Sequence, residues 1–151
     1  MKSSTTSGGD RLTAAPKFLG TALFFALCLL AVSVQAATIT VTNGNDANSG
    51  SLRNAISSAV AGDVIVFSVA VTTVTLTTGE LLIDKNLTIN GGTNGVTITR
   101  SSGTFRIFNI STGTVSMSKL TITNGNPGSG QAGGIQNNGT LTMTDCAITG
   151  N

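Results

Sequence analysis

The chain has 151 residues, of which only 9% are charged, and it contains 19 glycines but no His, Trp or Tyr. Four of its charged residues, three basic and one acidic, lie within the first 17 positions, which leaves five basic and five acidic residues in the remainder. This balance argues against the clustered positive charge by which proteins bind nucleic acids. The missing His also excludes Ser-His-Asp and Cys-His catalysis.

Residues 1–36 have the features of a secretory signal peptide. A polar and basic start through Lys17 precedes an apolar run over 18–34. The sequence Val-Gln-Ala at 34–36 matches the pattern that precedes signal cleavage, so we expect cleavage after Ala36. A membrane anchor is the alternative, because the apolar run approaches the length of a membrane span. After cleavage the mature chain would keep no membrane-spanning segment.

Residues 37–63 predict a strand followed by a short helix. The stretch 37–42 alternates threonine with apolar residues, as half-buried strands do, and turn-forming residues follow over 43–50. Ser51 is the expected helix N-cap and Gly62 the expected stop. The expected apolar helix face consists of Leu52, Ala55, Ile56, Ala59 and Val60.

The opposite face of this helix, which includes Arg53, is expected to be solvated. A single amphipathic helix placed ahead of a series of strands can cover the open end of a strand stack.

Residues 64–151 predict consecutive short strands. The stretch Thr114–Asn126, TVSMSKLTITNGN, largely recurs 26 residues later as Thr140–Asn151, TLTMTDCAITGN. Recurrence at such a spacing indicates stacked coils that share a buried face. The apolar columns expected from the repeat are Leu87, Leu120 and Cys146; Ile89, Ile122 and Ile148; and Ile83, Met117 and Met143.

Two further features of this region predict local structure. The segment 105–110, FRIFNI, fits no single alternating register, so we expect a bulge or a turn there. Asn90, Asn124 and Asn151 each follow a strand, and we expect them to stack at equivalent turns.

The stretch Gly-Ser-Leu-Arg-Asn-Ala-Ile at 50–56, followed by Gly-Asp-Val-Ile-Val-Phe at 62–67, resembles the CSLREA-type segment that precedes right-handed parallel β-helices in exported bacterial proteins. Residues 80–91 and 133–143 are similar to coils of that pectin-lyase-like fold, also found in polymorphic outer membrane proteins. Gly50 stands where the family has Cys, and Asn54 where it has Glu.

This resemblance implies an all-β protein, a right-handed parallel β-helix with a short N-terminal capping helix. The expected organisation is a signal peptide over 1–36, the first strand and capping helix over 37–63, and β-helix coils over 64–151. The second copy of the repeat stops inside a coil at Asn151, so we expect the array to be truncated at its C-terminal end.

The β-helix resemblance makes polysaccharide cleavage the enzymatic alternative, because many such proteins are lyases or hydrolases with carboxylates on adjacent coils. Asp84 precedes Lys85, but Ser118 and Thr144 take the corresponding positions in later coils, so no column of carboxylates is expected. Asp145 corresponds instead to a lysine. We therefore predict that the chain is not an enzyme.

Other motifs predict no site either. The match to G-x-G-x-x-G at 128–133 has no helix after it and indicates a surface loop rather than a dinucleotide site. Asp46 with Asn48 could contact a calcium ion weakly, but a solvated turn is the preferred interpretation. Cys146 is expected to be a small core residue. The sequence thus predicts no catalytic, cofactor-binding or metal-binding residue and no cofactor.

The expected function is that of an exported β-helix segment, secreted or at the cell surface or outer membrane, with a structural or adhesin-like role. Its expected partners are a surface polysaccharide or a host or cell-surface ligand, and no nucleic acid. The alternative is the N-terminal part of a polysaccharide lyase or glycoside hydrolase. An uncovered edge at 147–151 also favours self-association through the last coil.

Overall fold

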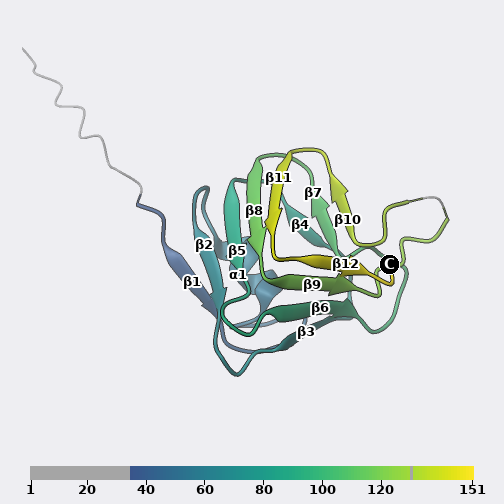
Figure 1. Cartoon of the computed structure of the whole chain (residues 1–151), viewed down its shortest axis with the longest axis horizontal. Coiled ribbons are helices and arrows are strands. Elements are labelled where there is room, and N and C mark those ends of the chain that lie inside the picture. Colours follow the sequence, from purple (N-terminus) through teal and green to yellow (C-terminus); the bar gives the residue numbers. More distant parts are fainter. Residues whose placement is uncertain (1–34, 130) are drawn as a thin grey trace, which may run out of the picture. The chain divides into compact units, whose positions relative to one another are not determined.

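The computed structural model describes residues 35–129 and 131–151, and the predicted leader therefore lies outside it except for Gln35 and Ala36. The described residues form a solenoid of about four turns whose strands pair in parallel within three sheets (Figure 1). The predicted all-β, parallel β-helix architecture is confirmed. Threonine, valine and isoleucine supply most strand positions, because β-branched side chains fit a pleated and half-buried surface.

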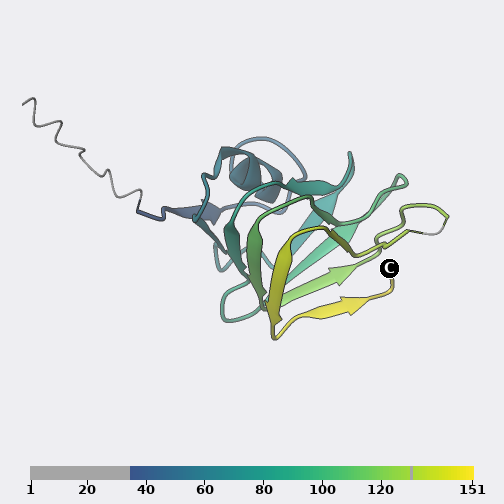
Figure 2. The same cartoon turned by 90° about the horizontal axis from the view of Figure 1, so that it is seen from above.

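Each sheet collects one strand from successive coils. Sheet A contains β1 (Thr38–Val41), β2 (Val64–Phe67), β5 (Leu87–Asn90), β8 (Thr114–Ser118) and β11 (Thr140–Thr144). Sheet B contains β3 (Thr73–Leu76), β6 (Val96–Arg100), β9 (Leu120–Thr123) and β12 (Ala147–Thr149). Sheet C contains β4 (Leu81–Ile83), β7 (Phe108–Ile110) and β10 (Ile135–Asn137). Figure 2 shows the three sheets enclosing one interior.

The 26-residue repeat corresponds to two successive coils. Met117 of β8 pairs with Met143 of β11, and Ile122 of β9 pairs with Ile148 of β12, as predicted. Each copy spans two sheets, because the chain turns sharply between its two strands. Lys119 and Asp145 make these turns with φ angles of 55° and 53°.

The first residue of each predicted column is wrong, because these turns separate residues that share a sequence pattern. Leu120 and Cys146 do align, since the next residues, Thr121 and Ala147, pair with each other. Leu87 pairs with Val115 in sheet A, whereas Leu120 pairs with Val96 in sheet B. The observed column through sheet A contains Ile39, Ile65, Ile89, Met117 and Met143.

The corresponding column through sheet B contains Val74, Ile98, Ile122 and Ile148. In sheet C, Ile83 pairs with Ile110 rather than with a methionine. The predicted asparagine stack is also wrong, because Asn90 lies in another sheet and Asn124 aligns with Gly150 rather than with Asn151. Asn90 ends β5 in sheet A, whereas Asn124 and Asn151 follow β9 and β12 in sheet B.

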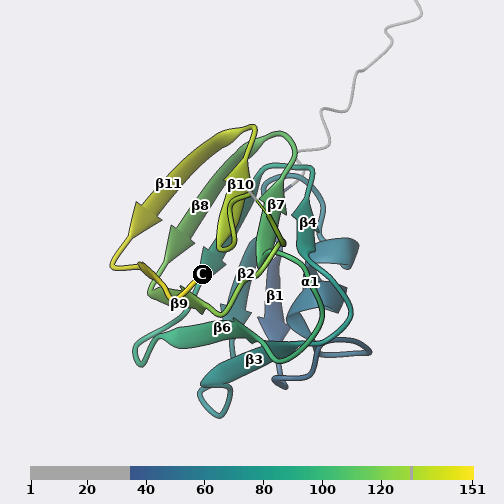
Figure 3. The same cartoon turned by 90° about the vertical axis from the view of Figure 1, so that its right-hand side faces the viewer.

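The helix α1 (Leu52–Ser58) occupies the first coil, where it follows β1 and contacts both β1 and β4 (Figure 3). The predicted N-cap is confirmed, since the Ser51 side chain accepts a hydrogen bond from the backbone N–H of Asn54. The predicted stop at Gly62 is wrong, because the helix already ends at Ser58. Consequently Val60 is not on the apolar helix face and is 53% exposed. The helix closes the N-terminal side of the core.

The segment 105–110 contains the predicted turn. β7 begins only at Phe108, and the neighbouring residues Ile107 and Phe108 are both fully buried, which strict alternation does not allow. Phe105 instead forms an isolated antiparallel bridge with Asn126. The chain therefore bends into sheet C at this point and turns two adjacent side chains inward.

Candidate functional site

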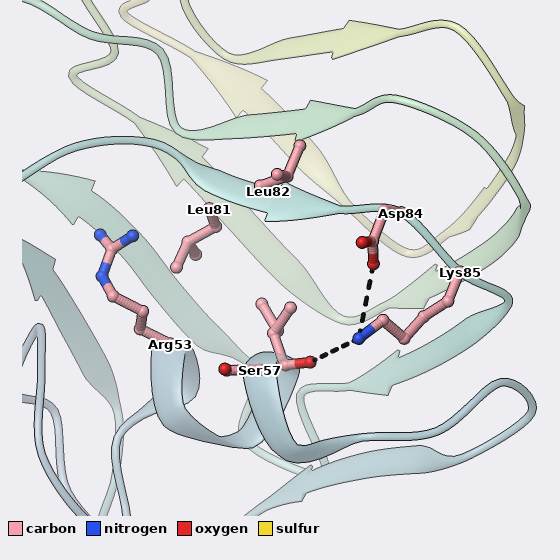
Figure 4. A pocket seen from close by; sticks show the side chains of 7 residues that line it. Arg53, Ser57, Leu81, Leu82, Asp84 and Lys85 are labelled. Carbon is pink, nitrogen blue, oxygen red and sulfur yellow. Dashed lines mark hydrogen bonds and ion pairs between the residues drawn. The ribbon is translucent and has the colours of Figure 1, made fainter.

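A groove with a volume of about 320 Å³ lies between α1 and the segment containing β4 (Figure 4). Its lining residues are Arg53, Ile56, Ser57, Leu81, Leu82, Asp84 and Lys85. Figure 4 shows Arg53 at one end of the groove and Asp84 with Lys85 at the other. Whether these charged groups can bind a ligand depends on their existing partners.

Arg53 is held by the loop that precedes α1. Its Nε and Nη2 atoms donate hydrogen bonds to Oδ1 of Asp46 over 3.0 and 2.6 Å. Its Nη1 and Nη2 atoms also donate to the carbonyl oxygens of Glu80 and Gly79 over 2.7 and 2.6 Å. The interpretation of Arg53 as a solvated residue is therefore wrong, because its guanidinium group donates hydrogen bonds to backbone carbonyl groups immediately before β4.

Asp46 is buried, with 7% of the residue exposed, and is not in a solvated turn as predicted. Its Oδ2 atom accepts hydrogen bonds from the backbone N–H and hydroxyl groups of both Thr77 and Thr78. Burial alone would raise the pKa of the Asp46 carboxyl group, but hydrogen bonds from Thr78, Arg53 and Thr77 outweigh it and lower the pKa to about 2. Both oxygens are used by the protein, so this geometry does not favour a calcium site.

Lys85 is bound to the opposite end of α1. Its Nζ atom donates to the carbonyl oxygens of Ile56 and Ala59 over 3.4 and 3.2 Å, and it lies 3.4 Å from Oδ1 of Asp84. A cation at a helix C-terminus satisfies carbonyl groups that have no partner within the helix. Both cations of the groove therefore fasten the capping helix.

The two aspartates considered for polysaccharide cleavage lie in different parts of the fold. Asp84 follows β4 in sheet C and borders the groove, whereas Asp145 makes the turn between β11 and β12. Among the described residues, no group of three or more His, Cys, Asp and Glu side chains is arranged to hold a metal ion.

A cluster of polar side chains at the start of the sheet C strands was not predicted from the sequence. Arg106 Nε lies 2.9 Å from Oε2 of Glu80, and Asn109 Nδ2 donates to Oε1 of Glu80 over 2.7 Å. Arg106 Nη1 and Asn109 Oδ1 are buried and have no hydrogen-bond partner within the described ranges. Glu80 precedes Arg106 by about one coil length, and that spacing between opposite charges was the available signal.

Sheet B has an outer surface made almost entirely of threonine. One row contains Thr73, Thr97 and Thr121, and the other contains Thr75, Thr99, Thr123 and Thr149. We call these seven residues the threonine face. The residues between the rows, Val74, Ile98 and Ile122, are fully buried, which shows that the threonines point outward. Figure 1 shows the four strands that carry them side by side.

The threonines of this face form a regular array that is set by the spacing between strands and along each strand. Neighbouring strands lie about 4.8 Å apart, and alternate residues along one strand lie about 6.6 Å apart. Most of the threonines are half-buried by their neighbours, whereas Thr73 and Thr149 are exposed. Thr99 Oγ1 accepts a hydrogen bond from Asn124 Nδ2 over 2.9 Å, so one hydroxyl of the face is already engaged. The result is a regular surface of hydroxyl and methyl groups without a formal charge.

The remaining motifs lie on the surface or at the edge of the core. The part of the G-x-G-x-x-G match that the structure describes forms bends and turns, with no helix after it. Cys146 is half-buried and packs against the core with a free thiol. No helix in the part of the chain that the structure covers is long and apolar enough to cross a membrane.

Comparisons of the chain with protein-family models, with curated proteins and with solved structures gave no significant match.

Proposed function

We propose that the chain is an exported β-helix segment, secreted or at the cell surface or outer membrane, with an adhesin-like binding role towards polysaccharide. The observation that carries the binding proposal is the threonine face of sheet B. It is the most regular outward-facing set of side chains on the described coils, and the parallel pairing of β3, β6, β9 and β12 holds its rows in register.

The chemistry of the threonine face favours an uncharged ligand with a repeat of its own. Each hydroxyl group can donate one hydrogen bond and accept others, and each methyl group can contact the apolar side of a sugar ring. A rigid sheet presents these groups without ordering a loop on binding, which lowers the entropic cost of association. Because the face has no formal charge, we propose a neutral polysaccharide rather than a uronate polymer.

The binding proposal is tested with the full chain and insoluble neutral polysaccharides, with pectin as the charged comparison. Replacing Thr97 and Thr121 together by Glu should weaken binding about tenfold or more, because charge and bulk enter the centre of the face. The matched control replaces Thr88 and Ser116 by Glu, since these residues are paired outward positions of sheet A. Absence of binding by the unchanged protein, or equal losses in both variants, would refute the role of the threonine face.

The export proposal is supported by the leader pattern at residues 1–36 and is tested separately. The full chain is produced in a bacterial host, and the intact mass of the exported product is measured. We expect the mass of residues 37–151. Retention of the leader in exported protein would contradict the proposed cleavage.

Self-association through the last coil is also proposed. Among the described residues, β11 and β12 have a paired strand on one side only. Ile148 of β12 is 50% exposed, and the core residues Leu141 and Met143 are only half-buried. An edge with free backbone groups and an apolar inner surface can pair with a second copy of the chain.

Polysaccharide cleavage is the second candidate function, and the pairing of Glu80 with Arg106 on adjacent coils is the observation that favours it. Such chemistry uses carboxylates as acid and base, and Glu80 is one carboxylate that lies beside a basic residue of the next coil. Here each group neutralises the other, which favours a structural role. Lytic activity on uronate polymers that is abolished by Glu80→Gln or Asp84→Asn, with the fold retained, would replace the binding proposal.

A further inference from the structure

Asp63 is a buried carboxylate beside the start of the first strand. The residue is 3% exposed, and its two oxygens accept hydrogen bonds from backbone N–H groups. Oδ1 accepts from Ala37 over 2.8 Å, and Oδ2 accepts from Val60 over 2.9 Å. The ion pairs found among the described residues involve Asp46, Asp84 and Glu80, and none of them involves Asp63. The buried negative charge is thus held only by neutral donors.

The backbone of Ala37 is fixed against the same segment from both sides. Its N–H group donates to Asp63, and its carbonyl oxygen accepts a hydrogen bond from the N–H group of Val64 over 2.8 Å. Gln35, Ala36 and Ala37 are exposed and lie outside any strand or helix, since β1 begins at Thr38. The Ala36–Ala37 bond is therefore at the boundary between an exposed segment and the first strand of the solenoid.

We propose that Asp63 is the counter-ion for an α-ammonium group at Ala37, created by cleavage of the Ala36–Ala37 bond. This inference rests on the proposed export and on its expected cleavage position. In the hydrolysis, a signal peptidase uses one water molecule. The Ala36 carbonyl carbon gains the oxygen and ends as a carboxylate, while the Ala37 nitrogen leaves as an amine that is protonated near neutral pH.

The same nitrogen position then has a different electrostatic role. In the uncleaved chain it is a neutral amide donor that lies 2.8 Å from Oδ1 of Asp63. After cleavage the same nitrogen would carry a positive charge. Charge-assisted hydrogen bonds are stronger than neutral ones, and a buried charge without an opposite charge is costly. Cleavage should therefore stabilise the fold that the mature chain adopts.

The position of the cleaved bond matters in this arrangement. Consecutive Cα atoms are about 3.8 Å apart, so an ammonium group one residue earlier would lie beyond direct contact with Asp63. Cleavage one residue later would remove Ala37 and its two hydrogen bonds to residues 63 and 64. The fold thus distinguishes the predicted terminus from its neighbours.

The test uses the full chain with residues 31–36 replaced by the recognition sequence of a protease that leaves Ala37 as the first residue. Urea unfolding is measured on the same preparation before and after cleavage. We expect cleavage to raise the folding equilibrium constant about tenfold, which corresponds to about 1.4 kcal/mol. The increase should be absent in Asp63→Asn, which retains an oxygen acceptor but has no charge.

A second variant keeps the test decisive if Asp63→Asn does not fold. One glycine is inserted before Ala37, so that cleavage places the ammonium group one residue too early while Asp63 is retained. This variant should also lose the increase. An unchanged equilibrium constant after cleavage of the protein with Asp63, or an equal increase in either variant, would overturn the inference. Removal of the natural leader at a different bond in the exporting host would instead contradict the expected cleavage after Ala36, and with it the assignment of Asp63 as counter-ion of a natural terminus at Ala37.

Discussion

Arg53 and Asp46 form a two-point contact in which Nε and Nη2 of the guanidinium group both donate to Oδ1 of the carboxylate. Arg53 lies on α1, and Asp46 lies in the loop before it. Through its other contacts the pair also holds the backbone at Gly79 and Glu80, just ahead of β4. Arg53 therefore joins the first coil to the second, together with Lys85, the contacts of Asp46 with Thr77 and Thr78, and the apolar contacts of the helix.

Arg53→Ala should lower the free energy of unfolding by about 3 kcal/mol, because it leaves the buried Asp46 carboxylate without its positive partner. Urea unfolding of the full chain measures this change. The control is Asn54→Ala on the same helix, since Asn54 is exposed and its substitution should change stability by less than about 0.5 kcal/mol. Similar losses in the two variants would contradict the role assigned to Arg53.

The lowered pKa of Asp46 predicts a loss of stability in acid. The folded-state pKa is about 2 and the reference value is 3.8, so the stabilising contribution is present above about pH 4 and is lost as the pH falls towards 2. The loss should be on the order of 2 kcal/mol. Unfolding measured across this range should show a smaller pH dependence in Asp46→Asn. Identical pH profiles for the two proteins would argue against the prediction.

The strands and their inward positions were largely predictable, because they depend on local patterns. Val96 and Ile98 are two residues apart on one strand, as are Leu120 and Ile122 on another, so each pair shares the buried face of its strand. This holds whichever sheet the strand belongs to. The repeat also predicted that Met117 and Met143 would stack. These features need only the period of a strand and the spacing of a coil.

The assignment of strands to sheets was not predictable from the same patterns. It depends on where the chain turns, and two of the turns use Lys119 and Asp145 in the left-handed region, where residues other than glycine are uncommon. No glycine or proline marks these positions. Equivalent-looking residues such as Leu87 and Leu120 consequently fall in different sheets.

The polar contacts were missed because they join residues far apart in the sequence. Asp46 meets Thr77 and Thr78 across one coil, and Glu80 meets Arg106 across another. In a chain with few charged residues, composition alone favours the interpretation that each of them is solvated. Opposite charges separated by about one coil length would have been the informative pattern.

Gly91→Ala should lower the free energy of unfolding by about 2 kcal/mol or more, as overpacking does in tight cores. Gly91 lies just after β5, and a Cβ atom at this position would collide with the backbone carbonyl oxygen of Lys119 on the next coil. The Gly91 N–H group also donates to the carbonyl oxygen of Ser118, which fixes the two coils at this separation. Thermal or urea unfolding measures the loss.

Gly79→Ala is the matched control for Gly91→Ala. A Cβ atom at Gly79 would have no neighbour within 4 Å, and its backbone does not require a positive φ angle. This substitution should leave stability unchanged or raise it slightly, because alanine restricts the unfolded chain. Equal destabilisation by both substitutions would contradict the proposed close approach between the coils.

Ile148→Lys should reduce the self-association that we propose for the last coil. Ile148 continues the sheet B column beyond Ile122, but it is 50% exposed in β12, which has a paired strand on one side only among the described residues. A second copy that pairs there would bury this side chain, and a lysine at the same position would bring an unpaired charge into the contact. Sedimentation velocity over a range of protein concentrations should therefore show a shift of the variant towards the monomer.

Leu82→Lys separates this effect from a general gain in solubility. Leu82 is 51% exposed, which closely matches Ile148, but it lies on β4 in the second coil, away from the uncovered edge. The two substitutions add the same charge and remove a similar apolar area. If association depends on the edge formed by β11 and β12, only Ile148→Lys should weaken it. A monomeric unchanged protein, or equal effects of the two variants, would exclude association through the last coil.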